Sequence, residues 1–246
     1  MLAAVVLLYA LFLAVQSAGL FGGESYLADR GLSYAQWARS GFFQMVGVTV
    51  VNLTVLLVSV AFSRRSVRSF AAVRLLGAAL TAESFLLLAS AAWRMTLYVE
   101  AYGLSFKRCM TYWGMGMMAL FFLAAAFKLA KPDFGFFRAA APMALAGWLV
   151  INCVPVDFLV ARDQVDRYLS GQSETIDVEY LLCSLSYDTL SQLERLDGDL
   201  ICRDWGAGGQ TRLSTLLAER RAQAREDCAD WRTWNLSACL AAMGGD

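Results

Sequence analysis

The chain has 246 residues, of which 58% are apolar and 17% charged, with equal numbers of acidic and basic residues. A soluble domain usually has about half apolar and about a quarter charged residues, so this composition argues against an ordinary soluble protein. Histidine is absent, which removes the commonest general base, the commonest metal ligand and every Ser-His or Cys-His pair. Dinucleotide-binding, P-loop and HExxH patterns are also absent. We therefore expect no catalytic residues, no metal and no cofactor.

Long runs without charge divide the first part of the chain. Each is close to the roughly 20 residues with which a helix crosses a hydrocarbon core of about 30 Å. Runs this long and this rich in Leu and Ala cross lipid as helices, which satisfy their own backbone hydrogen bonds. The predicted spans are residues 2–22, 42–62, 74–94, 109–128 and 138–156. This pattern predicts an all-α integral membrane protein with about five transmembrane helices in residues 1–156, and a charged, mostly helical C-terminal domain in residues 157–246.

The first run, LAAVVLLYALFLAVQSAGLFGG, has a second interpretation as a secretory signal peptide. It has no positive N-terminal region, its apolar stretch is long for a signal, and no clear small-x-small cleavage site follows. A membrane span is the favoured interpretation. Because so little chain precedes it, we expect that upstream segments are missing.

The two parts of the chain carry opposite charge. Residues 1–156 hold twelve Lys or Arg and five Asp or Glu, whereas residues 157–246 hold nine Arg, no Lys and sixteen Asp or Glu. The acidic tail argues against a nucleic-acid partner. The connections 63–74 and 128–138 are basic, and the positive-inside rule places them in the cytoplasm. If all spans are real, the tail is extracytoplasmic.

The tail has helical patterns and no strand pattern. Residues 157–169 are amphipathic, residues 176–196 have apolar positions at helical spacing, and residues 211–240 read as one long helix or two. Glycines at positions 198, 206, 208 and 209 interrupt these patterns.

Glu83 lies in the middle of the third predicted span. A carboxylate in hydrocarbon costs several kcal/mol unless it faces other helices or water, so Glu83 is a candidate functional residue. The equal alternative is a protonated or Arg-paired side chain that helps the helices to pack. Gln44, Asn52 and Thr54 on the preceding span are the hydrogen-bonding side chains that such packing would use.

A corner is expected between the third and fourth predicted spans. The helix should continue past Arg94, Tyr102 suits a membrane interface, and Gly103 allows a sharp turn back. Glu100 is close enough in sequence to pair with Arg94 or Lys107. A structural corner is favoured over a binding surface. If the helices instead enclose a pocket, the candidate polar site consists of Glu83, Arg94, Glu100 and Tyr102.

Four of the six cysteines lie in the tail. An even number in an extracytoplasmic segment permits disulfides, with three pairings open. The alternative is that the cysteines are small buried apolar residues, and their spacing is not that of zinc ligands. The candidate disulfide cysteines are Cys183, Cys202, Cys228 and Cys239.

Six segments occur in a distinctive order: YALFLAVQSAGLFGG, GLSYAQWARSGFFQMVGV, RMTLYVEAYGLSFKR, PVDFLVARDQVDRYL, IDVEYLLCSLSYDTL and DWRTWNLS. Over nearly the whole chain this resembles the bacterial multi-spanning membrane family called domain of unknown function 4173, which is related to 4153. The resemblance implies a multi-pass protein of the bacterial cytoplasmic membrane, with further helices upstream, and it implies no activity. The family tends to show Asn near Val154 or Pro155, Asn in place of Asp163, and Ala-Pro in place of Thr189 and Leu190. The roles of these positions are therefore in doubt here.

Two hypotheses for function follow from these observations. The favoured one is a non-enzymatic scaffold, sensor or partner subunit, whose partners are the lipid bilayer and another membrane or extracytoplasmic protein. The alternative is a transporter or membrane-embedded enzyme acting on a lipid or small solute between the helices.

Overall fold

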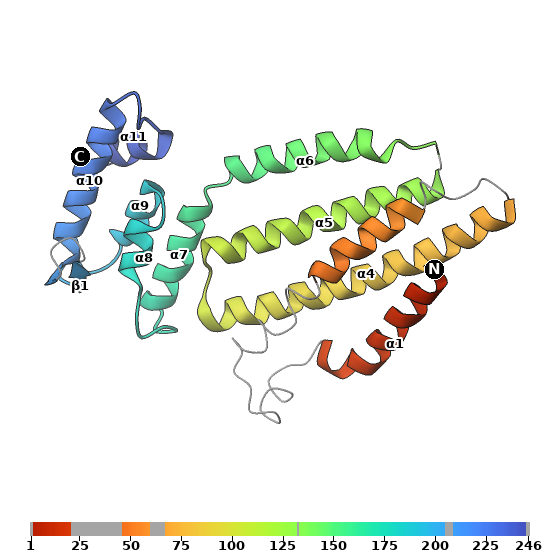
Figure 1. Ribbon diagram of the computed structural model, residues 1–246. Helices are drawn as coiled ribbons and strands as arrows, with labels where there is room; N and C mark the ends of the chain where they lie inside the picture. The colour runs from red at the N-terminus through yellow and green to blue at the C-terminus, as the bar shows by residue number, and fades with distance from the viewer. Residues whose placement is uncertain (1, 21–45, 60–66, 132, 205–208, 245–246) are drawn as a thin grey trace. The chain divides into compact units, whose positions relative to one another are not determined.

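The computed structural model describes residues 2–20, 46–59, 67–131, 133–204 and 209–244, and the chain divides into two compact units (Figure 1). The N-terminal unit comprises Met1–Tyr102 and Lys107–Ile151. The C-terminal unit comprises Gly103–Phe106 and Asn152–Asp246. A short connection between two helices of the N-terminal unit therefore folds as part of the C-terminal unit.

The N-terminal unit is built from apolar helices. Among the residues that the structure describes, three helices are long and apolar enough to cross a membrane: residues Ala71–Tyr102 of α4, all of α5 and all of α6. The helix Val46–Ser59 is apolar and shorter, and α1 precedes it (Figure 1). The bounds of the labelled helices are α1 Leu2–Leu20, α4 Val67–Tyr102, α5 Phe106–Ala130 and α6 Phe136–Cys153.

Helix α4 is much longer than the span predicted at residues 74–94. Its 36 residues correspond to about 54 Å at 1.5 Å per residue, against a hydrocarbon core of about 30 Å. The expected continuation of the helix beyond Arg94 is confirmed. The expectation of a basic connection through residue 74 was wrong from Val67 onward, because VRSFAAVR contains no glycine or proline to stop a helix. Residues 63–66 lie outside the described part of the chain.

Among the described residues, two apolar clusters hold the N-terminal unit together. The first joins α4 to α5, and Val46 and Val48 also pack against it. Its buried members are Leu87, Leu88, Ala91, Met95 and Met115. The second joins α4, α5, α6 and the helix Val46–Ser59, and its buried members are Leu56, Leu80, Ala124, Ala125, Leu129 and Phe136. Elsewhere between α4 and α5, the Phe85 and Phe122 rings lie 5.9 Å apart.

Helix α6 keeps most of its apolar side chains exposed. Phe136 is its buried residue, whereas Leu145, Trp148 and Val150 are each more than half exposed. Besides Phe136, it contacts α5 at Gly147, whose carbonyl oxygen accepts a hydrogen bond from Trp113 Nε1 at 3.1 Å. A helix that is apolar around its circumference and exposed in the isolated chain is suited to a lipid environment.

The C-terminal unit begins with four helical segments that pack together. Helix α7 (Val156–Leu169) matches the predicted amphipathic helix. The predicted helical stretch 176–196 is instead divided into α8 (Val178–Cys183), η1 (Tyr187–Thr189) and α9 (Leu190–Leu193). The division falls at Ser186, whose backbone is extended and whose N–H donates to Asp157 Oδ2 at 2.9 Å.

A β-hairpin and two helices complete the unit. Strand β1 (Ile201–Asp204) pairs antiparallel with β2 (Gly209–Arg212), so the expectation of no strands was wrong. Strands of four residues are too short to show a clear alternating pattern, and the cluster of glycines was the available signal for a hairpin. Helices α10 (Leu213–Ala229) and α11 (Leu236–Met243) follow, which matches the two-helix reading of residues 211–240.

Candidate functional site

The connection between α4 and α5 is held through its backbone. Gly103 has a positive φ of 73°, a conformation that side chains disfavour. At the next residue the Leu104 N–H donates to Asp163 Oδ2 at 2.7 Å, and the Leu104 carbonyl accepts from Gln164 Nε2 at 2.7 Å. Both backbone polar groups of Leu104 are therefore satisfied by side chains of α7.

A third contact comes from α8. The Phe106 N–H donates to the Tyr180 hydroxyl at 3.0 Å, and the Tyr180 N–H in turn donates to Asp177 Oδ1, which caps α8. We call the three side chains that hold this connection, Asp163, Gln164 and Tyr180, the loop clamp. Its hydrogen bonds are made to backbone groups of this chain, which is the arrangement of a structural corner. The sequence indicated Gly103, gave Asp163 only as a departure from the family pattern, and did not single out Gln164 or Tyr180.

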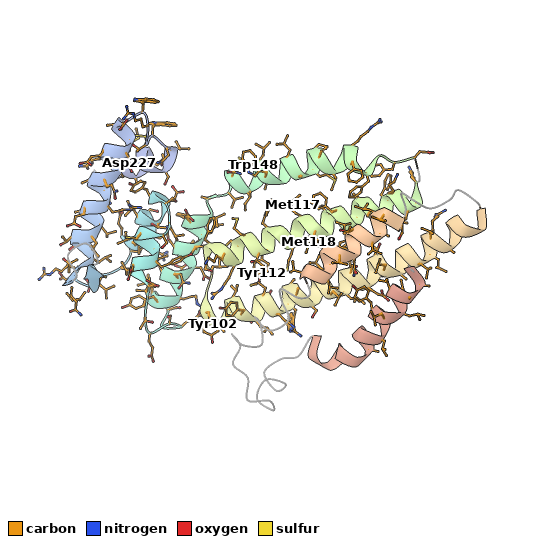
Figure 2. The ribbon with its side chains drawn as sticks, in the orientation of Figure 1. Tyr102, Tyr112, Met117, Met118, Trp148 and Asp227 are labelled. Atoms are coloured by element: carbon orange, nitrogen blue, oxygen red, sulfur yellow. A yellow bond between two sulfur atoms is a disulfide. The ribbon has the colours of Figure 1, made fainter. Side chains whose placement is uncertain are left out.

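Within the N-terminal unit, Arg108 stabilises the end of α4. Its Nη1 donates to the Tyr102 carbonyl at 3.0 Å, which satisfies an acceptor at the end of α4. Its guanidinium lies 4.1 Å from the centre of the Tyr98 ring, and the Tyr98 and Tyr102 rings are 5.2 Å apart. Tyr102, labelled in Figure 2, is thus part of this stack at the end of the helix.

The four predicted polar-site residues all lie on α4 but are spread along it. Glu83 and Glu100 are separated by about 25 Å at 1.5 Å per residue, since α4 is continuous between them. Arg94 is half-buried, and Glu100 and Tyr102 are exposed. The structure therefore does not bring Glu83 and Glu100 into one pocket. Glu83 is separate from the corner at the end of α4. Pairing of Glu100 with Arg94 or Lys107 stays a prediction.

Glu83 is half-buried in the N-terminal unit. Its Oε2 atom is buried and has no hydrogen-bond partner among the described residues. Tyr9 of α1 lies close enough to interact with it electrostatically. A carboxyl oxygen left without a donor inside a helix bundle is costly.

The polar side chains that were expected to pair with Glu83 bond elsewhere. Asn52 Nδ2 donates to Ser84 Oγ at 3.0 Å, inside the core. Thr54 Oγ1 donates to the Val50 carbonyl at 3.0 Å in its own helix. Gln44 lies outside the described residues. Asn52 therefore joins two helices, as packing hydrogen bonds in membrane proteins do.

Two of the four candidate disulfide cysteines are joined in the structure. Cys228, at the end of α10, forms a disulfide with Cys239 of α11, with the Cα atoms 5.0 Å apart. Cys183 is an exposed thiol and Cys202 a buried one. Burial raises the pKa of the Cys202 thiol, which makes it a poor nucleophile at neutral pH. No group of three or more Cys, Asp or Glu side chains able to hold a metal ion occurs within the described ranges.

An exposed aromatic surface covers the region around α11, and the sequence did not indicate it. Trp231 is 83% exposed and Trp234 60% exposed. Arg232 lies with its guanidinium 5.6 Å from the Trp231 ring centre. Asn235 caps α11 by accepting from the Ala238 N–H at 2.8 Å, which fixes the helix next to this surface. We call it the tryptophan surface, and it consists of Trp231, Trp234, Leu236, Leu240 and Met243.

Three candidate membrane-spanning helices followed by a charged unit with a disulfide define a helical membrane protein. Residues 1–196 match the family model described as domain of unknown function (DUF4153), and the chain belongs to this family. The match is to this relative of the 4173 family and not to 4173 itself. No curated protein and no solved structure matches the chain. The loop clamp lies inside the matched residues, whereas the tryptophan surface lies beyond them.

Proposed function

We propose that the protein is a non-enzymatic scaffold, sensor or partner subunit whose C-terminal unit binds another extracytoplasmic protein. The tryptophan surface carries this proposal. Several large apolar side chains stay exposed within thirteen residues of a charged domain, as they do at interaction sites, and Trp, Met and Arg are enriched at protein–protein interfaces.

The charge of the tail favours a protein over the bilayer as the occupant of this surface. Residues 157–246 carry nine Arg and sixteen acidic residues, a net charge of −7. A unit of this charge is repelled by anionic lipid head groups. A protein partner with an apolar centre and a basic rim complements both the tryptophan surface and its acidic surroundings.

We also propose that the C-terminal unit lies outside the cytoplasmic membrane of a bacterium, with α1 and the helix Val46–Ser59 completing five spans. A disulfide persists in an oxidising compartment, and Cys228 and Cys239 form one. The turn between α5 and α6 carries Lys128 and Lys131 against Asp133, as cytoplasmic connections do. Two crossings, by α5 and α6, return the chain to the side on which Gly103–Phe106 lies. Membership of these four residues in the C-terminal unit agrees with this arrangement.

The loop clamp supports the role of a sensor or coupled subunit. Asp163, Gln164 and Tyr180 hold the segment that joins α4 to α5. A partner that changes the position of α7 or α8 therefore acts directly on the connection between two membrane-spanning helices. An effect of binding on those helices requires such a shared element.

A site-specific photocrosslink tests the proposed function. A benzoylphenylalanine in place of Trp234 is expected to give one main protein adduct in native membranes, and the same group at the exposed Gln172 of the C-terminal unit is expected to give none. Trp231→Ala should reduce the Trp234 adduct severalfold without changing the amount of inserted protein. Adducts to lipid alone, or equal protein adducts from both positions, would count against a protein partner.

The transporter alternative rests on a separate observation: in a candidate membrane span, the Oε2 atom of Glu83 has no hydrogen-bond partner within the described part of the chain. If protons pass through this carboxyl, proteoliposomes loaded with a pH-sensitive dye will show a proton flux that Glu83→Gln removes. The same substitution should leave the Trp234 adduct unchanged. An absence of flux in the wild-type chain would remove the reason for this alternative.

A further inference from the structure

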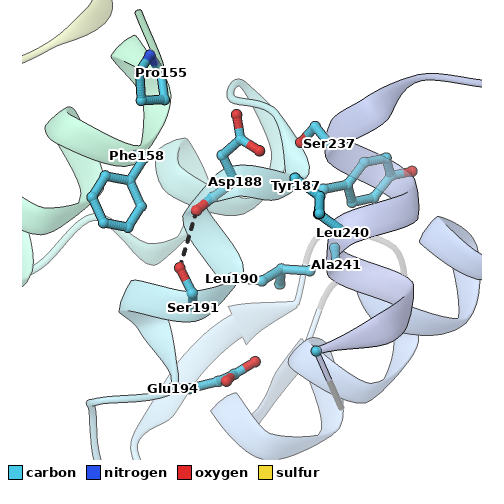
Figure 3. Close-up of a pocket in the computed structure, with 11 residues that line it drawn as sticks. Pro155, Phe158, Tyr187, Asp188, Leu190, Ser191, Glu194, Ser237, Leu240 and Ala241 are labelled. Carbon is cyan, nitrogen blue, oxygen red and sulfur yellow. Dashed lines mark hydrogen bonds between the residues drawn. The ribbon is translucent and has the colours of Figure 1, made fainter.

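A groove of about 360 Å³ lies within the C-terminal unit, between the start of α7, the segment η1–α9 and helix α11 (Figure 3). The groove is lined by Pro155, just before α7, and by Phe158 in α7. Leu190 lines it from α9, and Leu240 and Ala241 line it from α11. Small-molecule sites in proteins occupy about 300–1,000 Å³ and are mostly apolar, with a few polar groups that fix orientation. The groove has both properties.

The polar groups of the groove are few. Ser237 lines it from α11, and its Oγ atom is buried without a hydrogen-bond partner among the described residues. Asp188 places a carboxylate at the groove, while Glu194 is paired with Arg221. Lysine and arginine do not occur among the described residues that line it. The groove therefore offers an unmatched hydroxyl and a negative charge next to an apolar wall.

The groove lies close along the chain to a candidate membrane span. Helix α6, the candidate span, ends at Cys153. Pro155, which lines the groove, follows two residues later, which is at most about 7 Å of extended chain. The wall of the groove therefore begins next to the end of this helix.

We propose that the groove binds one hydrocarbon chain of a membrane lipid whose head group carries an amine. The apolar wall formed by Phe158, Leu190 and Leu240 takes the chain out of water. The Ser237 hydroxyl donates to an oxygen of the lipid, and the Asp188 carboxylate faces the ammonium group. This site is separate from the tryptophan surface, apart from Leu240, and does not depend on a protein partner.

Photolabelling of the full chain tests the proposal. The protein is placed in phosphatidylcholine nanodiscs that contain a small fraction of phosphatidylethanolamine with a diazirine in its acyl chain. Labelled peptides are then located by mass spectrometry. We expect the phosphatidylethanolamine probe to label the peptides that contain Phe158 and Leu240, in addition to the membrane-spanning helices. The matching phosphatidylglycerol probe should label the groove peptides at least threefold less.

Ala241→Phe fills the groove and should reduce its label at least tenfold, whereas Met243→Phe, on the exposed side of the same helix, should not. Label on α5 and α6 serves as the internal standard, and an intact Cys228–Cys239 disulfide reports folding. If Ala241→Phe fails to fold, Ser191→Phe fills the groove from its opposite, exposed wall. Unlabelled groove peptides in the wild-type chain, or equal label in the filled and control variants, would overturn the proposal. Equal label from both probes would overturn the choice of head group.

Discussion

Single side chains decide how the connection between α4 and α5 is held. Asp163 and Gln164 are neighbours on α7, yet one accepts from and the other donates to the same residue, Leu104. A buried peptide group without partners costs about 1–3 kcal/mol. Replacement of either side chain therefore leaves Leu104 with an unmatched backbone group.

Gly103→Ala should lower the stability of the C-terminal unit more than Gly171→Ala does. Both glycines have a positive φ, 73° and 75°, so both substitutions carry the cost of about 1–2 kcal/mol for a left-handed residue. A Cβ on Gly103 would also lie 2.7 Å from Gln164 Nε2, whereas nothing lies within 4 Å at Gly171. Displacement of Gln164 adds the loss of one hydrogen bond, about 1 kcal/mol. Urea unfolding followed by tryptophan fluorescence measures the difference, and equal losses would show that the clamp contributes nothing.

Tyr187 links η1 to α10 and gives a second prediction. Its hydroxyl donates to Asp227 Oδ2 at 2.5 Å, and the Arg220 guanidinium lies 4.3 Å from its ring centre. Burial, and then the hydrogen bond to Asp227, raise the pKa of Tyr187 to about 12 from an ordinary value near 10. The folded state favours the protonated phenol, so its stabilisation is complete below about pH 10 and is lost as the pH rises toward 12.

Tyr187→Phe should therefore cost about 2 kcal/mol at pH 8, because Asp227 loses a hydrogen bond. It should also flatten the decline in stability between about pH 10 and pH 12. Urea midpoints of the two chains across this range provide the measurement. A parallel decline in both chains would mean that other groups cause it.

Helices α5 and α6 come close at Gly147, in addition to the packing of Phe136 against α5. A Cβ on Gly147 would lie 2.3 Å from Met117 Sδ, next to the hydrogen bond from Trp113 to the Gly147 carbonyl. Elsewhere α6 is mostly exposed. Gly147 therefore sets how closely the two helices approach at this point.

Gly147→Ala should destabilise the N-terminal unit, while Gly114→Ala in α5 should be neutral or stabilising. Alanine is preferred over glycine in a helix by about 1 kcal/mol, and nothing lies within 4 Å of a Cβ at Gly114. At Gly147 the same gain in helix stability is opposed by the cost of displacing the buried Met117 side chain. Thermal unfolding in detergent compares the two variants. An equal or higher midpoint for Gly147→Ala would show that α6 is free to move away without cost.

The long helices were predictable because their signal is collective. Each apolar run extends over many residues, so one charged residue such as Arg74 does not hide it. The end of α4 was predictable from Gly103, whereas its start at Val67 was not, because that start lies in a basic stretch before the apolar pattern begins. The β-hairpin and the short helices α8 and α9 were missed because four to six residues are too few to show a period. The loop clamp depends on contacts between distant segments, which no local pattern reports. The tryptophan surface depends on which side chains stay exposed.

The arrangement of the chain across the membrane is tested by labelling single cysteines. Replacing the four free cysteines by serine and keeping Cys228 and Cys239 gives the background. In intact cells a membrane-impermeant maleimide should label Glu174→Cys, while Lys131→Cys should label only after lysis. Label on Glu174→Cys only after lysis would place the C-terminal unit in the cytoplasm, which would also remove the compartment that its disulfide requires.

The two units differ in how their parts are distributed along the chain, and this bears on the order in which they are made. Asn152–Asp246 is synthesised after α4 and α5, yet its unit also includes Gly103–Phe106, the connection between these two helices. A segment from residue 152 onward, produced alone, would leave Asp163, Gln164 and Tyr180 facing water where Leu104 and Phe106 belong. Completion of the C-terminal unit therefore requires the connection between α4 and α5 to be available to residues 152–246. Folding of this unit is in this way linked to the earlier formation of the α4–α5 pair.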